Sequence, residues 1–144
     1  MDELDIKIIK LLKSNSRMTG SEIGKRINLS VPAVAERMRK LEDGGIISQY
    51  TIKIDRDKLD RGLMAFIFAT IEKTEHIKGF REAIKSEEAV LECHHIAGEY
   101  DYLLKVVVKN TSDLEEFISN KLKKTAGVTR TNTIIALSSI KEEV

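Results

Sequence analysis

Residues 19–42 read Thr-Gly-Ser-Glu-Ile-Gly-Lys-Arg-Ile-Asn-Leu-Ser-Val-Pro-Ala-Val-Ala-Glu-Arg-Met-Arg-Lys-Leu-Glu, and this stretch decides the fold. It predicts two short helices joined by a tight turn. Ile23 and Ile27 lie four residues apart, on one face of the first helix. Asn28 tolerates the left-handed backbone that such a turn needs. Ser30 can then cap the second helix.

The second helix has a predicted inner and outer face. Val34, Met38 and Leu41 recur at the spacing of a buried helical stripe. The opposite face is small and basic, and a short helix of this kind can enter the major groove of DNA. An ordinary helical hairpin within a core is the alternative. The candidate DNA contacts are Ser30, Pro32, Ala33, Glu36, Arg37, Arg39 and Lys40.

The composition is that of a globular protein. The chain has 144 residues, of which 42% are hydrophobic and 33% charged. No apolar run approaches the roughly 18 residues of a membrane span. The N-terminus is acidic and lacks the apolar core of a signal peptide, and a single cysteine cannot form an internal disulfide. These features predict a cytoplasmic protein.

Charge is distributed unevenly along the chain. Residues 1–61 contain 13 Lys and Arg against 10 Asp and Glu, whereas residues 62–144 contain 11 against 13. The half with the helix-turn-helix candidate is therefore mildly basic. Such a small excess predicts modest DNA affinity for one subunit, which oligomerisation would multiply.

The rest of the first 54 residues completes a DNA-binding domain. Residues 2–14 form an amphipathic pattern with Asp2 as a plausible cap. The glycines at 44 and 45 end the third helix. Residues 50–54 alternate between apolar and polar side chains and predict a strand. Residues 1–54 therefore predict a winged-helix-like helix-turn-helix domain, and the charged residues 55–62 predict a linker.

Residues 63–144 predict a second domain with alternating strands and helices. The order strand, helix, strand, strand, helix, strand is that of a ferredoxin-like βαββαβ domain, so the fold class is α+β. A capping box of Ser112 and Glu115 marks the start of the second helix. The predicted strands are 63–71, 90–97, 103–108 and 133–137, and the predicted helices are 76–85 and 112–124.

The strand pattern of this domain predicts a homodimer. Helices cover only one face of a ferredoxin-like sheet, so the other face should carry alternating polar residues. Residues 63–69 and 106–108 do not alternate, and both faces therefore need burial. A second copy of the sheet, related by a two-fold axis, would cover the open face.

Cys93, His94 and His95 invite a metal site or a nucleophile. Neighbours in a strand point to opposite faces, so only Cys93 and His95 could share one ion. Two ligands without nearby partners make a weak site, and no group is placed to orient a catalytic cysteine. We therefore predict packing roles, no metal, no cofactor and no enzymatic activity.

Several motifs, in matching order and spacing, resemble those of the Lrp/AsnC family of regulators. The opening helix is similar in Leu4-Asp5 and Leu11-Leu12. Leu29-Ser30, Val34, Arg37 and Leu41-Glu42, followed by Gly45-Ile46-Ile47, resemble the recognition-helix signature. Gly98-Glu99-Tyr100-Asp101-Tyr102 resembles the family's glycine-to-aspartate loop, and residues 131–137 resemble its last strand.

The resemblance implies an assembly and an effector. Family members form dimers through the second domain and commonly assemble into octamers, as tetramers of dimers. Many bind an amino acid near the glycine-to-aspartate loop, at the contact between dimers. Carried onto this chain, the candidate effector residues are Gly98, Tyr100, Asp101, Thr131 and Thr133. Gly24 departs from the family, which more often has alanine there.

The sequence therefore predicts a sequence-preferring transcriptional regulator that binds double-stranded DNA as a multimer in the nucleoid. One alternative is an architectural protein that wraps or bends DNA with low specificity, because the outer helix face offers few bidentate base readers. A small-molecule-binding or catalytic ferredoxin-like protein is a third possibility. The helix-turn-helix half argues against it.

Overall fold

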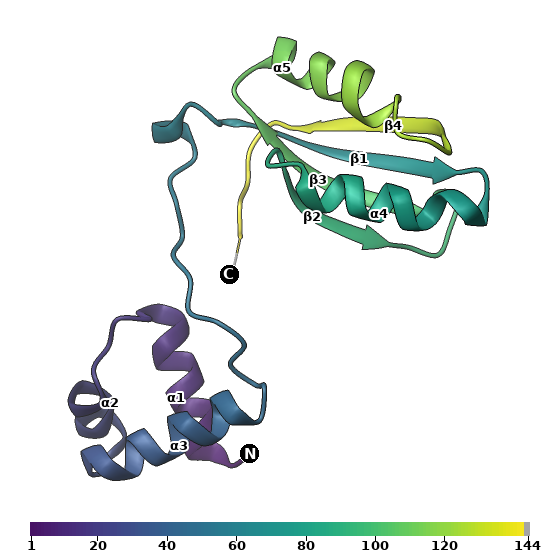
Figure 1. Cartoon of the computed structure of the whole chain (residues 1–144). Coiled ribbons are helices and arrows are strands. Elements are labelled where there is room, and N and C mark those ends of the chain that lie inside the picture. Colours follow the sequence, from purple (N-terminus) through teal and green to yellow (C-terminus); the bar gives the residue numbers. More distant parts are fainter. Residues whose placement is uncertain (143–144) are drawn as a thin grey trace. The chain divides into compact units, whose positions relative to one another are not determined.

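The computed structural model describes residues 1–142, which divide into two compact units (Figure 1). The first unit spans Met1–Ile54 and the second Asp55–Glu142. The segment 55–62, predicted to be a linker, thus belongs to the second unit, where Asp57–Leu59 forms one 3-10 turn.

Three helices build the first unit. They are α1 (Glu3–Ser14), α2 (Gly20–Ile27) and α3 (Val31–Asp43). Both α1 and α2 begin with a capping box, in which the cap side chain and the third helical residue satisfy each other's backbone N–H. The helices enclose a small core of Ile8, Leu12, Met18, Ile23, Val34 and Leu41.

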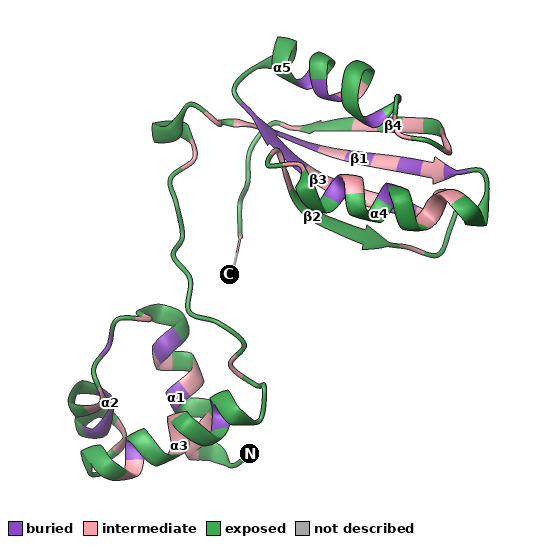
Figure 2. Cartoon of the chain, in the orientation of Figure 1, coloured by how far each residue is buried: buried purple, intermediate pink, exposed green. Residues whose placement is uncertain are grey.

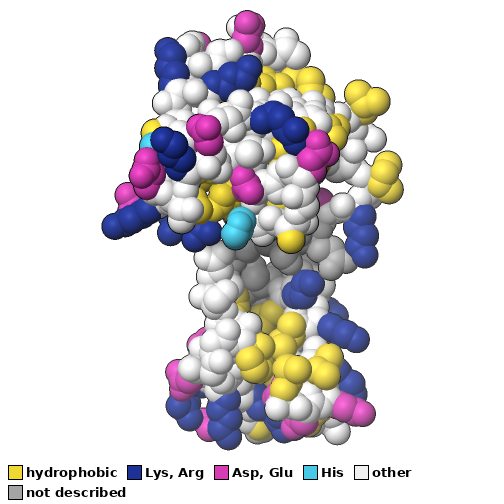
Figure 3. Space-filling model, turned by 90° about the vertical axis from the view of Figure 1, so that its right-hand side faces the viewer, with side chains coloured by type: hydrophobic (Ala, Val, Ile, Leu, Met, Phe, Trp, Pro, Cys, Tyr) yellow, Lys and Arg dark blue, Asp and Glu magenta, His cyan; other side chains and the backbone are white. Residues whose placement is uncertain are grey.

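The predicted strand over residues 50–54 is absent, which corrects the sequence-based expectation. The segment has no regular secondary structure and no strand partner within residues 1–142. A strand without a neighbour has no backbone ladder to stabilise it. Its alternating side chains Tyr50, Ile52 and Ile54 are exposed. Figure 3 shows hydrophobic side chains gathered on one face of this unit, the lower one in that view.

The second unit is a four-stranded antiparallel sheet with two helices, in the order β2-β3-β1-β4. Its elements are β1 (Leu63–Ile71), α4 (Ile77–Ser86), β2 (Val90–His95), β3 (Tyr102–Val108), α5 (Thr111–Glu116) and β4 (Val128–Ala136). This topology confirms the ferredoxin-like prediction. The fourth strand begins five residues before its predicted start, and the second strand ends two residues before its predicted end.

The start of α5 also differs from the prediction. Its cap is Asn110, whose side chain accepts from the Asp113 N–H at 2.9 Å, so the capping box of Ser112 and Glu115 does not form. Beyond Glu116 the helix continues as a π-helical turn, Phe117–Leu122.

Alternate residues of β1 face opposite sides of the sheet. Ala65, Ile67 and Ala69 are fully buried, and with Phe80 and Leu114 they belong to the core beneath α4 and α5. The other face of the sheet, here called the open face, carries half-buried side chains, whereas β2 is exposed along most of its length (Figure 2). Half-buried or exposed apolar residues of the open face are Phe66, Phe68, Leu103 and Ile134.

An ion cluster joins the segments that precede β1 and follow β4. Arg56 donates two hydrogen bonds to the Glu142 carboxylate, at 3.0 and 3.1 Å, and Lys105 of β3 also donates to it. The Arg56 and Lys105 cations lower the pKa of Glu142 to about 2. The 55–62 segment is therefore held on the second unit by charge-assisted hydrogen bonds.

This cluster predicts a specific loss of stability in acid. Because the pKa of Glu142 is lowered, its contribution is complete above the ordinary value of 4.5 and disappears as pH falls toward about 2. The wild type should lose more unfolding free energy than Glu142→Gln between about pH 5 and about pH 3. Urea titrations at both pH values measure this difference. Glu115→Gln removes an exposed carboxylate outside the cluster and should lose as much unfolding free energy as the wild type. An equal loss between the two pH values for all three proteins would contradict the prediction.

Candidate nucleic-acid interface

The turn between α2 and α3 is built by local backbone bonds. Asn28 ends α2 in the left-handed conformation, with φ of 58°, and the Leu29 N–H donates to the Gly24 carbonyl at 2.9 Å. Ser30 then caps α3, accepting from the Ala33 N–H at 3.4 Å, and Pro32 lies in the first turn, where no N–H is needed. The predicted turn residues thus have the predicted roles.

The outer face of α3 lies opposite the core stripe. Val34 is fully buried and Leu41 is 3% exposed, whereas the side chain of Glu36 is 49% exposed. At about 100° per residue, Glu36 projects about 200° around the helix from Val34. The residues that project on this side of α3, opposite Val34, are Pro32, Glu36, Arg39, Lys40 and Asp43.

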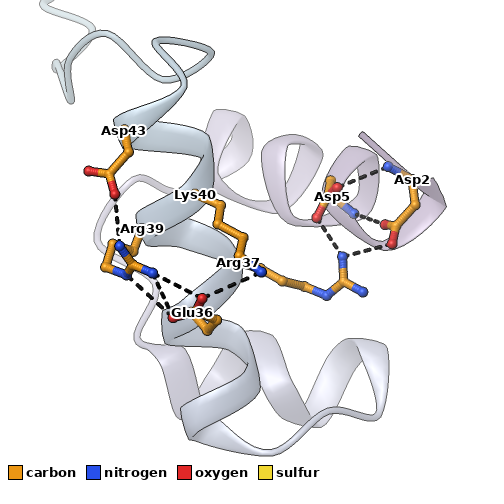
Figure 4. Close-up of polar contacts among 7 residues, drawn as sticks. All are labelled: Asp2, Asp5, Glu36, Arg37, Arg39, Lys40 and Asp43. Atoms are coloured by element: carbon orange, nitrogen blue, oxygen red, sulfur yellow. Dashed lines mark hydrogen bonds and ion pairs between the residues drawn. The ribbon is translucent and has the colours of Figure 1, made fainter.

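Two carboxylates pair with the cations of this face (Figure 4). Arg39 contacts Glu36 at 3.0 Å and Asp43 at 2.9 Å, and Lys40 contacts Glu36 at 3.4 Å. The hydrogen bonds and charge of Arg39, with those of Lys40, lower the pKa of Glu36. These pairs are exposed and therefore weak, so a phosphate can compete for either cation.

Arg37 occupies a different place from the other candidate contacts. Its guanidinium points to the start of α1, where it donates to Asp2 at 2.8 Å and to Asp5 at 2.6 Å (Figure 4). Its side chain is only 28% exposed. Hydrogen bonds from backbone N–H groups at the α1 N-terminus, together with those from Arg37, lower the pKa values of Asp2 and Asp5. Arg37 thus connects α3 to α1. Its place on the flank of the buried stripe predicted a partly structural role, but not these two partners.

Family models match both units. The model described as "Winged helix-turn-helix DNA-binding" matches residues 1–48, and the one described as "Lrp/AsnC ligand binding domain" matches residues 64–144. The chain belongs to the Lrp/AsnC family. This confirms the resemblance and the α+β fold class, and it makes the chain a DNA-binding transcriptional regulator of the Lrp/AsnC type.

Relatives match over nearly the whole chain. The HTH-type transcriptional regulator LrpC of Bacillus subtilis (strain 168) is 35% identical over 97% of this chain and 94% of that protein. The leucine-responsive regulatory protein of Escherichia coli (strain K12) is 31% identical over 99% and 88%. A transcriptional regulator of Neisseria meningitidis, solved as a complex with L-Met, is 31% identical with a TM-score of 0.96, covering 99% of this chain and 94% of that one.

The loop that corresponds to the Lrp/AsnC glycine-to-aspartate motif is fastened to β1 by Asp101. Its carboxylate accepts from the Ile71 N–H at 2.8 Å, and its own N–H donates to the Ala69 carbonyl at 3.0 Å. The Ile96 N–H donates to the Asp101 carbonyl at 2.8 Å, which closes the β2–β3 hairpin. Asp101 therefore has a structural task whether or not a ligand is bound.

Tyr100 lies over the open face of the sheet. Its ring packs on Phe68 with centroids 5.3 Å apart, and the Arg130 guanidinium lies 4.3 Å from the Tyr100 centroid. Arg130 also contacts Glu99 at 2.8 Å. Thr70, two residues beyond Phe68, has a buried hydroxyl with no hydrogen bond to any residue of the described chain. Arg130 and Thr70 were not among the predicted effector residues. Their pairing depends on the register of β4 on β1, which the sequence pattern did not give.

Thr131 and Thr133 lie apart from Tyr100. They pair with Ala69 and Ile67, which face α4 and α5, so they occupy the covered face of the sheet. Tyr100 occupies the open face. One subunit therefore does not bring all the candidate effector residues together. Gly98 lies in the loop, and no atom stands within 4 Å of the position that a Cβ would take there.

The cysteine and histidines of β2 divide between the two faces, as strand alternation predicts. His95 stacks on Tyr102 of the covered face, with ring centroids 5.0 Å apart, and Cys93 pairs with Leu104. His94 contacts Glu92, which also accepts from Lys105 of the open face. Residues 1–142 contain no group of three or more histidine, cysteine, aspartate and glutamate side chains arranged for a metal ion.

In the part of the chain that the structure describes, no helix is both long and apolar enough to cross a lipid bilayer.

Proposed function

We propose that this regulator acts as a multimer on double-stranded DNA with a preference for sequence, with α3 lying in the major groove. The observation that carries this proposal is the outer face of α3, which is exposed, begins with small residues and carries Arg39 and Lys40 at one end. In helix-turn-helix proteins the start of the second helix contacts base edges. We place it on the chromosome in the cytoplasm and give it no enzymatic role, because its relatives are regulators.

The double variant Arg39→Ala with Lys40→Ala tests this docking. If both cations contact phosphates, the variant should bind all sequences more weakly, and the slope of log affinity against log salt should flatten by about 2 per subunit. Electrophoretic or fluorescence titration at several salt concentrations measures both effects. Lys78→Ala with Lys85→Ala, two exposed cations on α4, is the matched control. An Arg39 and Lys40 variant that is folded and binds like this control would contradict the docking.

The proposed multimer begins with a two-fold dimer of the second unit. Phe66, Phe68 and Leu103 on the open face are only partly covered, and Ile134 is 52% exposed. Several partly exposed apolar side chains on one face of a sheet are typical of an association site. We further propose that dimers assemble into an octamer, as the family resemblance implies. The small basic excess of residues 1–61, with 13 Lys and Arg against 10 Asp and Glu, supports assembly, since one DNA-binding unit attracts DNA only weakly.

We propose a small amino acid as effector, bound near the Gly98 to Asp101 loop between neighbouring dimers. The similar Neisseria regulator was solved with L-Met, and the E. coli relative is named leucine-responsive. Arg130 could hold the ligand carboxylate beside Tyr100, and the free Thr70 hydroxyl could bond to it. Because Thr131 and Thr133 occupy the covered face, they would take part only if a neighbouring dimer presents them.

Calorimetry against the twenty amino acids, paired with light scattering, tests the effector. Arg130→Ala should abolish ligand binding and any ligand-dependent change in size, while thermal unfolding stays unchanged because the Glu99 ion pair is exposed. Glu99→Gln is the control and should bind as the wild type does. Absence of binding at millimolar concentrations would refute the effector proposal.

Asp101→Ala should give a different result from Arg130→Ala. It leaves the partly buried Ile71 N–H without its acceptor, a loss of about 1–3 kcal/mol. We therefore expect lower stability for this variant even without ligand, measured by urea unfolding. Equal stability of Asp101→Ala and the wild type would contradict the structural task of Asp101.

An architectural role is the second candidate, because Glu36 and Asp43 occupy much of the α3 outer face and pair with its cations. Footprinting separates the two functions. Discrete protected half-sites support a sequence-preferring regulator, whereas long phased protection supports DNA wrapping.

A further inference from the structure

A carboxylate stands where α3 would approach the bases. Glu36 lies on the line directly opposite the buried stripe, one turn after the half-buried Ala33 and beyond Pro32. Neither of those side chains has a hydrogen-bonding group. Glu36 is therefore the first polar side chain that the outer face presents after the Ser30 cap. In a helix placed with its N-terminal half in the major groove, this position reaches base edges.

The Glu36 carboxylate is ionised and oriented. Arg39 donates to both of its oxygens, at 3.0 and 3.1 Å, and Lys40 contacts one of them at 3.4 Å. Both cations leave the helix about one turn further on and contact the carboxylate from that side. Arg39 and Lys40 would thus screen Glu36 from the DNA backbone while the carboxylate keeps lone pairs for another donor.

A carboxylate can only accept hydrogen bonds, which restricts the bases it can contact. Guanine presents two acceptors in the major groove and thymine presents one acceptor and a methyl group, so both would repel it. Adenine has an amino group, but its N7 acceptor lies beside that group and opposes the second carboxylate oxygen. Cytosine presents its N4 amino donor without a neighbouring acceptor on the same base.

We propose that Glu36 is a specificity-determining residue that accepts a hydrogen bond from the N4 amino group of one cytosine in each half-site. This inference rests on the proposed placement of α3 in the major groove. In this arrangement the negative charge on the outer face of α3 contributes to the recognition of a DNA base. It also gives the protein a base reader where the sequence suggested there were few.

A selection from a randomised library of double-stranded DNA tests the proposal with the full-length protein. The wild type should enrich one cytosine position per half-site, and replacing that base pair should weaken binding by between about 5-fold and about 150-fold, the usual cost of one mismatched base pair. Glu36→Gln should exchange the preference at that position for adenine, because a glutamine amide pairs with adenine N6 and N7. Glu36→Ala should leave the position without preference and should bind DNA lacking the cytosine more tightly than the wild type does.

Asp43→Asn is the matched control, since it also removes a carboxylate bonded to Arg39 but lies two turns further along α3. It should keep the cytosine preference. Glu36→Asp, which keeps the charge but is one methylene shorter, should weaken the preference without creating one for adenine. Circular dichroism confirms that the variants fold.

Two outcomes would overturn the proposal while leaving the proposed function intact. In the first, Glu36→Gln binds DNA and still selects cytosine at the same position. In the second, Glu36→Gln and Glu36→Ala lose affinity equally for every sequence, which would make Glu36 only a partner that positions Arg39. A wild type that retains no DNA from the library would refute the proposed function together with this inference.

Discussion

Replacing Ile134 with glutamate is expected to give a monomeric protein. Its affinity for DNA should be lower than that of the wild type by at least about 100-fold. Ile134 lies on the open face of the sheet, directly opposite Phe66 in the β1–β4 ladder, and is 52% exposed. In the proposed dimer both two-fold related copies bury this position. A charge there would be buried without a partner, so the interface should not form. Loss of the dimer removes the avidity between the two DNA-binding units.

Ile135→Glu is the matched control for this experiment. Ile135 is 43% exposed, similar to its neighbour, but it pairs with Ala65 on the face covered by the helices. It should therefore remain dimeric and bind DNA normally, provided thermal unfolding shows it folded. Light scattering gives the mass, and DNA titration gives the affinity. A dimeric Ile134→Glu variant, or a monomeric one with undiminished DNA affinity, would contradict the role of the open face.

The sequence predicted the elements whose stability is local. Asn28 and Ser30 act within one helical turn of their own positions, and the turn and the cap that they predicted are present. The strand order also followed from the pattern, because alternation and helix order leave few topologies for such a domain. The strand predicted over residues 50–54 failed, because the pattern indicates which residues favour a strand but does not supply a neighbour to pair with.

The candidate sites were less predictable, because they depend on contacts between distant residues. Arg37 has the type and position of a DNA contact, yet Asp2 and Asp5, more than thirty residues away, hold its guanidinium. Thr131 and Thr133 were carried over by resemblance, and the β1–β4 register puts them on the covered face. The same register brings Arg130 to Tyr100. A sequence pattern can assign a face, but only the register decides which side chains meet there.

Gly24→Ala is expected to destabilise the first unit by about 2 kcal/mol, within the usual range for overpacking. A Cβ at Gly24 would approach the Leu29 carbonyl oxygen far closer than 3.0 Å, a separation that real Cβ atoms essentially never show. That oxygen belongs to the backbone of the α2–α3 turn, so the turn itself must move. The absence of a side chain at Gly24 therefore allows the turn to pack closely against α2. Because α3 is positioned by this turn, DNA affinity should fall as well.

Gly79→Ala separates this packing effect from the general preference of helices for alanine. Gly79 lies within α4, and nothing stands within 4 Å of the position its Cβ would take. Alanine there should stabilise the protein by about 0.5–1 kcal/mol, because glycine loses more backbone entropy in a helix. Urea unfolding of the two variants measures the difference, and the same substitution should have opposite signs at the two positions. Stabilisation by both would mean that the turn moves aside at little cost, and the close approach at Gly24 would then not hold α3 in place.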